Sequence, residues 1–97
     1  MKSLQDVKQL LRRNKQVFFD RYQVTEVGIF GSYAREEQTE LSDVDVLIDY
    51  VDAPTFFKLM ELRTFLGELM EMDVDVVTKN GLKPSIRERV LAEVVYV

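Results

Sequence analysis

Within residues 42–50, Asp43 and Asp45 alternate with Val44 and Val46, which is the period-two pattern of a β-strand with two different faces. In such a strand Asp43 and Asp45 point to one side, whereas Val44 and Val46 point to the other side, into a core. Two ionised carboxylates held side by side repel each other, and a divalent cation between them turns this repulsion into attraction. The segment therefore predicts a buried sheet face and, on the opposite face, a site for a hard cation.

A Gly-Ser pair follows a strand-like segment over residues 24–30 that is rich in β-branched and aromatic side chains, and ten residues separate this pair from Asp43. Gly31 lets the backbone approach a phosphate closely, and Ser32 adds a hydroxyl and a backbone N–H. A Gly-Ser pair alone indicates only a turn at the end of a strand. Its spacing from the two-carboxylate strand predicts a combined nucleotide and metal site.

A third acidic strand is expected over residues 72–78, where Asp73 and Asp75 alternate with apolar residues. A neighbouring strand can place one of these carboxylates across from Asp43 and Asp45, within reach of the same cations. The alternation does not distinguish Asp73 from Asp75, since both share one face. Three carboxylates in this arrangement are enough to clamp a pair of divalent cations.

The composition restricts which chemistry such a site can use. The 97 residues suit one domain and carry a net charge of −4, which argues against stable binding of long nucleic acid. The sequence has no cysteine and no histidine, so a metal must be bound by oxygen, which favours Mg²⁺, Mn²⁺ or Ca²⁺. No apolar run is long enough to cross a membrane, and the N-terminus lacks the apolar region of a signal peptide, so we expect a cytoplasmic protein.

The remaining segments are expected to be helical or irregular: helices over residues 4–21, 33–37, 52–71 and 84–93, a loop over 38–41 and, at 94–97, either a short strand or a fraying helix end. Ser3 and Asp6 have the spacing of a capping box for the first helix. Asp52 and Pro54 suit the start of the third. Together with the three strands, these segments predict an α/β domain with a small mixed β-sheet and helices packed mainly on one face.

Gly31-Ser32, the pair Asp43 and Asp45, and a later apolar strand carrying Asp75 together resemble the minimal nucleotidyltransferases of the DNA polymerase β superfamily. The resemblance extends over nearly the whole chain. It implies one minimal nucleotidyltransferase domain over residues 1–97 with the nucleotidyltransferase fold. It also favours Asp75 over Asp73, because the family's third aspartate stands directly before two apolar residues, as Asp75 does here.

The resemblance implies a role for each residue of the motif. Ser32 in the Gly31 turn would hold the terminal phosphates of a nucleoside triphosphate, with ATP as the expected donor. Asp43 and Asp45 would bind two Mg²⁺ ions, for which Mn²⁺ can substitute, and Asp75 would bind the catalytic ion and help to deprotonate the acceptor. Arg35, three positions after the serine, would steady the phosphates or the loop.

One departure from the family concerns the residues after Arg35. Members often carry glycine there, whereas this chain has Glu36 and Glu37, whose negative charges would repel a triphosphate unless they point to solvent. This departure favours an alternative in which the metal site is weakened and the chain does not act by catalysis. It would then be a binding-only antitoxin or a regulatory subunit that blocks a HEPN-domain partner protein by occupying its surface.

The expected acceptor is also implied by the resemblance. Superfamily enzymes that act on nucleic acids or antibiotics carry further domains to hold the acceptor, and no residues remain here for such a domain. Small transferases of this kind are typically encoded beside HEPN-domain proteins, many of them toxin ribonucleases. The leading hypothesis is an antitoxin that transfers AMP to a tyrosine of its HEPN partner, and transfer to a small molecule is a third possibility.

Overall fold

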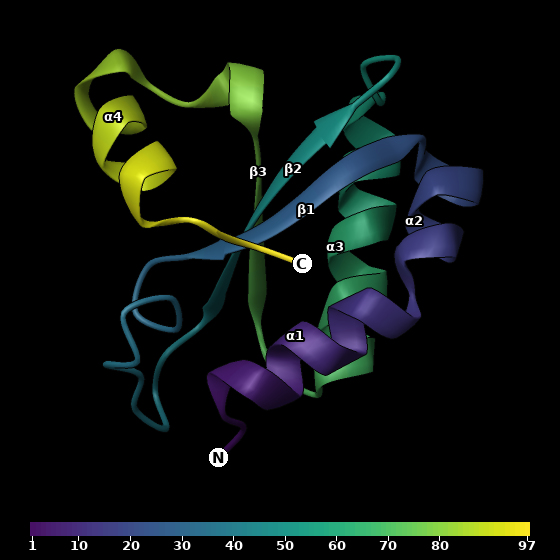
Figure 1. The fold of residues 1–97 in the computed structure, drawn as a ribbon. Coiled ribbons are helices and arrows are strands. Elements are labelled where there is room, and N and C mark those ends of the chain that lie inside the picture. The colour runs from purple at the N-terminus through teal and green to yellow at the C-terminus, as the bar shows by residue number, and fades with distance from the viewer.

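Three helices cover one face of a four-stranded sheet, and a fourth helix lies against the other face (Figure 1). This arrangement is seen in a computed structural model that describes residues 1–97. The helices are α1 (Leu4–Arg13), α2 (Lys15–Tyr22), α3 (Phe56–Met70) and α4 (Pro84–Glu93), and a short 3₁₀ turn spans Lys79–Gly81. The strands are β1 (Val24–Phe30), β2 (Val44–Tyr50), β3 (Val74–Thr78) and β4 (Val95–Tyr96).

The strands form a mixed sheet in the order β3-β2-β1-β4. β1 pairs antiparallel with β2 and with β4, whereas β2 and β3 are parallel and are connected through α3. Residues 94–97 thus contribute a short strand, one of the two alternatives that the sequence left open. The predicted α/β fold with a small mixed sheet and helices mainly on one face is confirmed.

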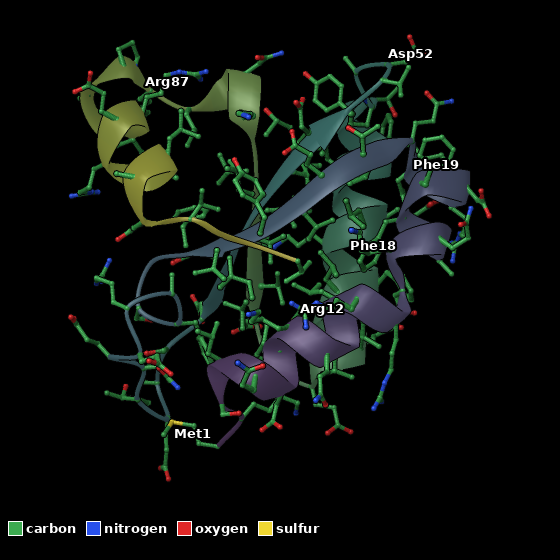
Figure 2. The ribbon with its side chains drawn as sticks, viewed as in Figure 1. Met1, Arg12, Phe18, Phe19, Asp52 and Arg87 are labelled. Carbon is green, nitrogen blue, oxygen red and sulfur yellow. The ribbon has the colours of Figure 1, made fainter.

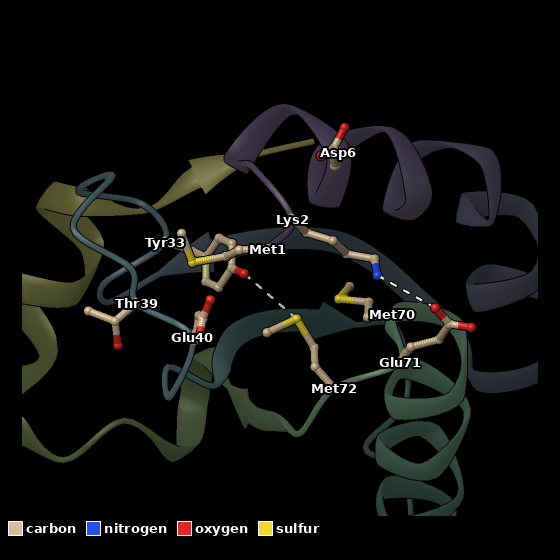
Figure 3. Close-up of a pocket in the computed structure, with 9 residues that line it drawn as sticks. All are labelled: Met1, Lys2, Asp6, Tyr33, Thr39, Glu40, Met70, Glu71 and Met72. Atoms are coloured by element: carbon tan, nitrogen blue, oxygen red, sulfur yellow. Dashed lines mark hydrogen bonds and ion pairs between the residues drawn. The ribbon is translucent and has the colours of Figure 1, made fainter.

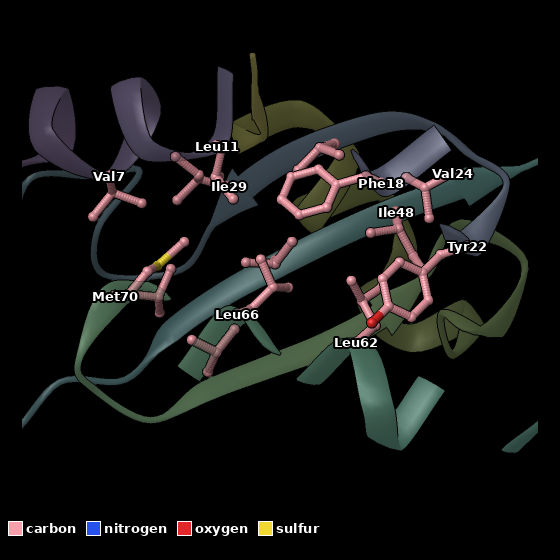
Figure 4. Close-up of a cluster of buried hydrophobic side chains, with 14 of the residues drawn as sticks. Val7, Leu11, Phe18, Tyr22, Val24, Ile29, Ile48, Leu62, Leu66 and Met70 are labelled. Atoms are coloured by element: carbon pink, nitrogen blue, oxygen red, sulfur yellow. The ribbon is translucent and has the colours of Figure 1, made fainter. Parts of the chain in front are cut away.

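The period-two pattern of β2 separates two hydrophobic clusters. Val44, Val46 and Ile48 are buried in the main cluster, which includes side chains from α1, α2 and α3 (Figure 4). Leu47 points the other way and packs with Val90 of α4 in a smaller cluster. Because side chains alternate along a strand, Asp43 and Asp45 share the face of Leu47 and α4.

The first helical segment is divided in two, so the prediction of one helix over residues 4–21 was wrong. Asn14 lies between α1 and α2 with φ −108° and ψ 8°, outside helical values, and its side chain donates to Leu10 O at 2.8 Å. The capping box was predicted correctly: Ser3 and Asp6 exchange hydrogen bonds of 3.0 and 3.1 Å. The break lets α2 turn Phe18 into the core, where it is 1% exposed, while Phe19 stays 48% exposed (Figure 2).

The start of α3 also differs from the prediction. Thr55, and not Asp52, is the N-cap, and its side chain accepts a hydrogen bond of 3.2 Å from the Lys58 N–H. Pro54 therefore lies before the cap and not in the first helical turn. A threonine cap suits this position because its hydroxyl satisfies an N–H that has no partner within the helix. No helix in the structure has the length and apolar character needed to span a membrane.

Candidate active site

The parallel ladder between β2 and β3 brings two of the predicted carboxylates together. Asp45 and Asp75 are direct partners in the register of this ladder, and Asp43 precedes β2 on the same face. Asp73 lies before β3, where its carbonyl accepts the Val44 N–H at 3.1 Å. Asp75, and not Asp73, therefore stands opposite Asp45.

On this face of the sheet, the surroundings of Asp45 raise the pKa of its carboxyl group. Asp45 is half-buried, whereas Asp43 and Asp75 are exposed. Burial raises the pKa of Asp45, and the negative charges of Asp75 and Asp43 raise it further. The positive charge of Arg35 acts in the opposite direction, but the net effect is a raised pKa of Asp45.

These side chains suit a divalent cation by their chemistry. All of the candidate ligands are carboxylate oxygens, which Mg²⁺ and Mn²⁺ prefer, and a cation would offset the repulsion at Asp45. No three acidic side chains of the chain are already gathered into a cluster that could hold a metal ion. The structure therefore places the carboxylates of Asp43, Asp45 and Asp75 on one face of the sheet. Binding of a cation would require these side chains to move closer to one another.

A pH-dependent stability follows from the raised pKa of Asp45. The carboxyl is more easily protonated in the folded chain than in the unfolded chain, so its ionised form destabilises the fold at neutral pH, and this destabilisation is relieved as the pH falls through the raised pKa. In EDTA, we expect Asp45→Asn to have a higher Tm than the wild type at pH 7, with a difference that shrinks toward pH 4. Thermal denaturation across this range tests the prediction, and the exposed Asp73→Asn serves as the control. An equal or lower Tm for Asp45→Asn at pH 7 would contradict it.

The turn after β1 lies directly against Asp45. Gly31 has φ +74°, a left-handed conformation that disfavours any residue with a side chain. A Cβ atom at this position would overlap the Asp45 Oδ2 atom. The absence of a side chain is therefore what allows the Gly-Ser turn and the carboxylate strand to meet.

Replacing Gly31 should therefore be costly. Gly31→Ala introduces left-handed strain and a clash with Asp45, so we expect the free energy of unfolding to fall by about 2 kcal/mol or more. The matched control is Gly67→Ala in the last turn of α3, where the nearest atom to an added Cβ outside the adjoining helix backbone is the Met72 carbonyl oxygen at 3.4 Å, and alanine is the better helix former. Urea denaturation compares the two, and a similar effect of both substitutions would refute the role given to Gly31.

Residues 31–37 form an irregular turn, so the short helix predicted over residues 33–37 was wrong. The backbone N–H groups of Arg35, Glu36 and Glu37 donate to the carbonyls of Gly31, Tyr33 and Ser32 respectively, at 2.9 to 3.2 Å. These bonds span four, three and five residues, so they do not form the regular ladder of a helix. Ser32 thus lies in a tight turn and not at a helix N-terminus.

Arg35 is bound to two carboxylates in the structure. Its Nη1 atom lies 3.0 Å from Glu93 Oε2, and its Nε atom lies 3.4 Å from Glu37 Oε2. The hydrogen bond to Glu93 raises the pKa of Arg35 further above its usual value. Glu37 is thus paired with Arg35, and Glu36 is exposed. The contact with Glu93 was not anticipated from the sequence, because 58 positions separate the two residues and no local pattern marks it.

A surface hollow of about 470 Å³ lies beside this turn, and no predicted site residue lines it (Figure 3). Its wall includes Tyr33, whose hydroxyl donates to the Met72 sulfur at 3.7 Å, and the pair Lys2 and Glu71 at 3.9 Å. Its charged side chains are Lys2, Asp6, Glu40 and Glu71. With three acidic side chains and one basic side chain, this hollow is poorly suited to phosphates.

The site geometry, a glycine turn packed on a two-carboxylate strand with a third aspartate beside it, can be compared with known proteins. A family model described as a nucleotidyltransferase domain matches residues 7–97. The chain belongs to the nucleotidyltransferase family. Its relatives include the protein adenylyltransferase MntA of Thermococcus cleftensis, which is 42% identical over 97 residues, covering 100% of this chain and 98% of the relative. A Methanocaldococcus jannaschii protein, named provisionally as a protein adenylyltransferase, is 42% identical over 98 residues and is matched over the full length of both chains.

Solved structures of nucleotidyltransferases share the fold. One, described provisionally as a minimal nucleotidyltransferase, has a TM-score of 0.76 and 33% identity, and the match covers 97% of this chain and 95% of that one. A toxin-antitoxin structure with AMP-PNP has a TM-score of 0.73 at 22% identity, covering 98% of this chain and 72% of that one. A third, of a tri-AMPylated Shewanella oneidensis HEPN toxin in complex with an MNT antitoxin, has a TM-score of 0.70 at 18% identity, covering 93% and 70%. The chain therefore has the nucleotidyltransferase fold.

Proposed function

We propose that this nucleotidyltransferase transfers AMP from ATP to a tyrosine hydroxyl of a HEPN-domain toxin and thereby acts as its antitoxin, with residues 1–97 as a single minimal nucleotidyltransferase domain. The observation that carries the proposal is the packing of the Gly31 turn on Asp45, with Asp75 directly opposite Asp45 in the sheet. A phosphate bound to the turn would lie beside the carboxylates that hold its cations. Action in the cytoplasm stays a prediction from the sequence.

The comparisons support the choice of nucleotide and acceptor. Two full-length relatives at 42% identity carry the name of protein adenylyltransferases. Structures with the same fold include a toxin-antitoxin structure with AMP-PNP and an MNT antitoxin in complex with an AMPylated HEPN toxin. The first supports an adenine nucleotide as the ligand, and the second supports a HEPN protein as the partner.

In the proposed reaction the tyrosine oxygen attacks the α-phosphorus of ATP, the bond to the β-phosphate oxygen breaks, and pyrophosphate leaves. Asp75 receives the proton of the tyrosine hydroxyl, directly or through a water molecule. Asp43, Asp45 and Asp75 would hold Mg²⁺ or Mn²⁺, which lowers the pKa of the hydroxyl and offsets the charge of the triphosphate. Ser32 binds the phosphates through its backbone N–H and its hydroxyl group, the Gly31 turn lets them approach the backbone closely, and Arg35 uses the guanidinium N–H groups that its two carboxylate partners leave free.

Intact-mass spectrometry of a HEPN-domain partner protein tests the proposal. The purified pair is incubated with Mg²⁺ and, in separate reactions, with each of the four nucleoside triphosphates. We expect a mass increase of one or more AMP units with ATP alone, and fragmentation should locate it on a tyrosine. A mass increase with another nucleotide would correct the base, and an increase on another side chain would correct the acceptor.

A binding-only antitoxin is the second candidate, and two observations favour it. Arg35 is already paired with the carboxylates of Glu37 and Glu93, and no three acidic side chains are gathered into a metal-holding cluster. If this candidate is correct, no nucleotide produces a mass increase, although the two proteins still form a complex and the ribonuclease activity of the partner is still inhibited.

A further inference from the structure

We propose that Glu93, the last residue of α4, is a positioning residue that holds the turn of residues 31–37 in shape before a nucleotide arrives. The inference concerns a residue outside the nucleotidyltransferase motif, at the opposite end of the chain from the Gly-Ser pair. It rests on the proposed function in one respect, since it takes this turn to be the phosphate-binding element.

The Glu93 carboxylate contacts the turn at two residues, Gly31 and Arg35. Its Oε1 atom accepts the Gly31 N–H at 3.1 Å, and its Oε2 atom accepts from Arg35 Nη1 at 3.0 Å. Because one carboxylate contacts both groups, the distance between Gly31 and the Arg35 guanidinium is set by a single side chain. These residues lie 62 and 58 positions from Glu93, so the bridge also joins α4 to the loop between β1 and β2.

The bridge is better shielded from water than the other ion pair of Arg35. The Glu93 side chain is 18% exposed, whereas that of Glu37 is 67% exposed and contacts Arg35 at the longer distance of 3.4 Å. Exposed ion pairs contribute little because water and salt screen them, and a partly buried, charge-assisted hydrogen bond is stronger. Without Glu93, the guanidinium would be held by the weaker pair alone and would sample several rotamers.

Glu93 does not need to leave for a phosphate to bind. A guanidinium carries five N–H donors, of which Glu93 and Glu37 each take one in the structure, so three remain. The Glu93 carboxylate also balances the charge of Arg35 while no nucleotide is bound. This geometry favours a positioning role over one in which Glu93 competes with the phosphates.

Hydrogen exchange without nucleotide tests the ordering of the turn. We compare wild type with Glu93→Gln, which keeps an acceptor oxygen but removes the charge that pairs with Arg35, and with Glu88→Gln, an exposed glutamate of the same helix, as the matched control. We expect Glu93→Gln to exchange faster in peptides covering residues 31–37 and to leave the exchange of α1–α3 unchanged. Equal exchange in wild type and Glu93→Gln would overturn the proposal.

Ligand binding then tests whether the ordering serves the phosphates. Titration with Mg²⁺ and AMP-PNP at 0.15 M salt should show Glu93→Gln binding about three- to tenfold more weakly than wild type, because the arginine must be ordered during binding. AMP, which lacks the two outer phosphates, should lose less affinity, and a general structural defect would weaken both ligands alike. Unchanged or tighter AMP-PNP binding, or equal losses for both ligands, would overturn the proposal.

The two experiments separate this inference from the proposed function. If wild type binds AMP-PNP but modifies no partner, the proposed transfer fails, and the exchange and binding results still decide the role of Glu93. If wild type binds no nucleotide at all, the proposed function fails as well as the phosphate-positioning part of the inference. The exchange data alone then support or refute Glu93 as the residue that orders the turn.

Discussion

Combining Asp43→Asn with Asp45→Asn should abolish nucleotide transfer to the HEPN partner while the two proteins still form a complex. Both substitutions preserve shape and remove the charge with which these residues would hold cations. A bound cation supplies several kcal/mol of charge stabilisation, so the transfer rate should fall by at least about a thousandfold. The rate is measured by intact-mass spectrometry over time, and complex formation by size-exclusion chromatography of the mixed proteins.

The control for this double variant is Asp49→Asn. Asp49 lies on the same face of β2, near its far end, where its carboxylate accepts the Tyr50 N–H at 2.9 Å. This substitution removes one negative charge from the strand without touching the predicted site, so transfer should continue. If the double variant transfers AMP as fast as wild type, the carboxylates of β2 are not the cation ligands. If the double variant neither transfers AMP nor binds its partner, complex formation and transfer must be measured for each single variant, Asp43→Asn and Asp45→Asn.

Asp75→Asn should reduce transfer by about a hundredfold or more, whereas Asp73→Asn should leave it within about twofold of wild type. Asp75 faces Asp45 across the parallel ladder and is the proposed proton acceptor, and loss of a general base lowers rates by about two to four orders of magnitude. Asp73 is exposed outside the strand, and substitutions at such positions have small effects.

The two variants are a matched pair, since each changes one aspartate to asparagine and the residues are two positions apart. Initial transfer rates at saturating ATP, measured with the same partner preparation, decide between them. A large loss for Asp73→Asn with little loss for Asp75→Asn would reverse the assignment and would require a shift of β3 against β2. Equal losses for both variants would indicate that the whole acidic face, and not a single base, supports the reaction.

The two faces of β2 were predictable because they depend on a local rule. Side chains alternate along any strand. Once residues 43–46 are extended, the two valines must therefore point to one face and the two aspartates to the other. The same rule placed Asp75 on a common face with Asp73. The capping box at Ser3 was equally local, because its two partners are three residues apart.

The predicted elements were wrong at two places where the backbone lacks the regular hydrogen bonding of a helix. Residues 4–22 have the composition of one helix, but the chain breaks at Asn14 so that both α1 and α2 can pack their apolar side chains on the sheet. Residues 31–37 have no strong helix signal of their own, and their conformation depends on the left-handed Gly31 and on Glu93. Helix propensity is a weak prior in both places, because tertiary packing outweighs it.

Spacing and alternation within a few residues are enough to predict the candidate site residues: the glycine turn, the aspartates and their side of the strand. Which of these residues meet depends on how distant elements pack together. Alternation alone leaves Asp73 and Asp75 equivalent, and the family resemblance favours Asp75. Its position opposite Asp45 depends on the register between two strands that are separated by the whole of α3. The contact of Glu93 with Gly31 joins residues 62 positions apart. Such pairings depend on how complete elements pack against one another, and no pattern within a short stretch of sequence encodes that packing.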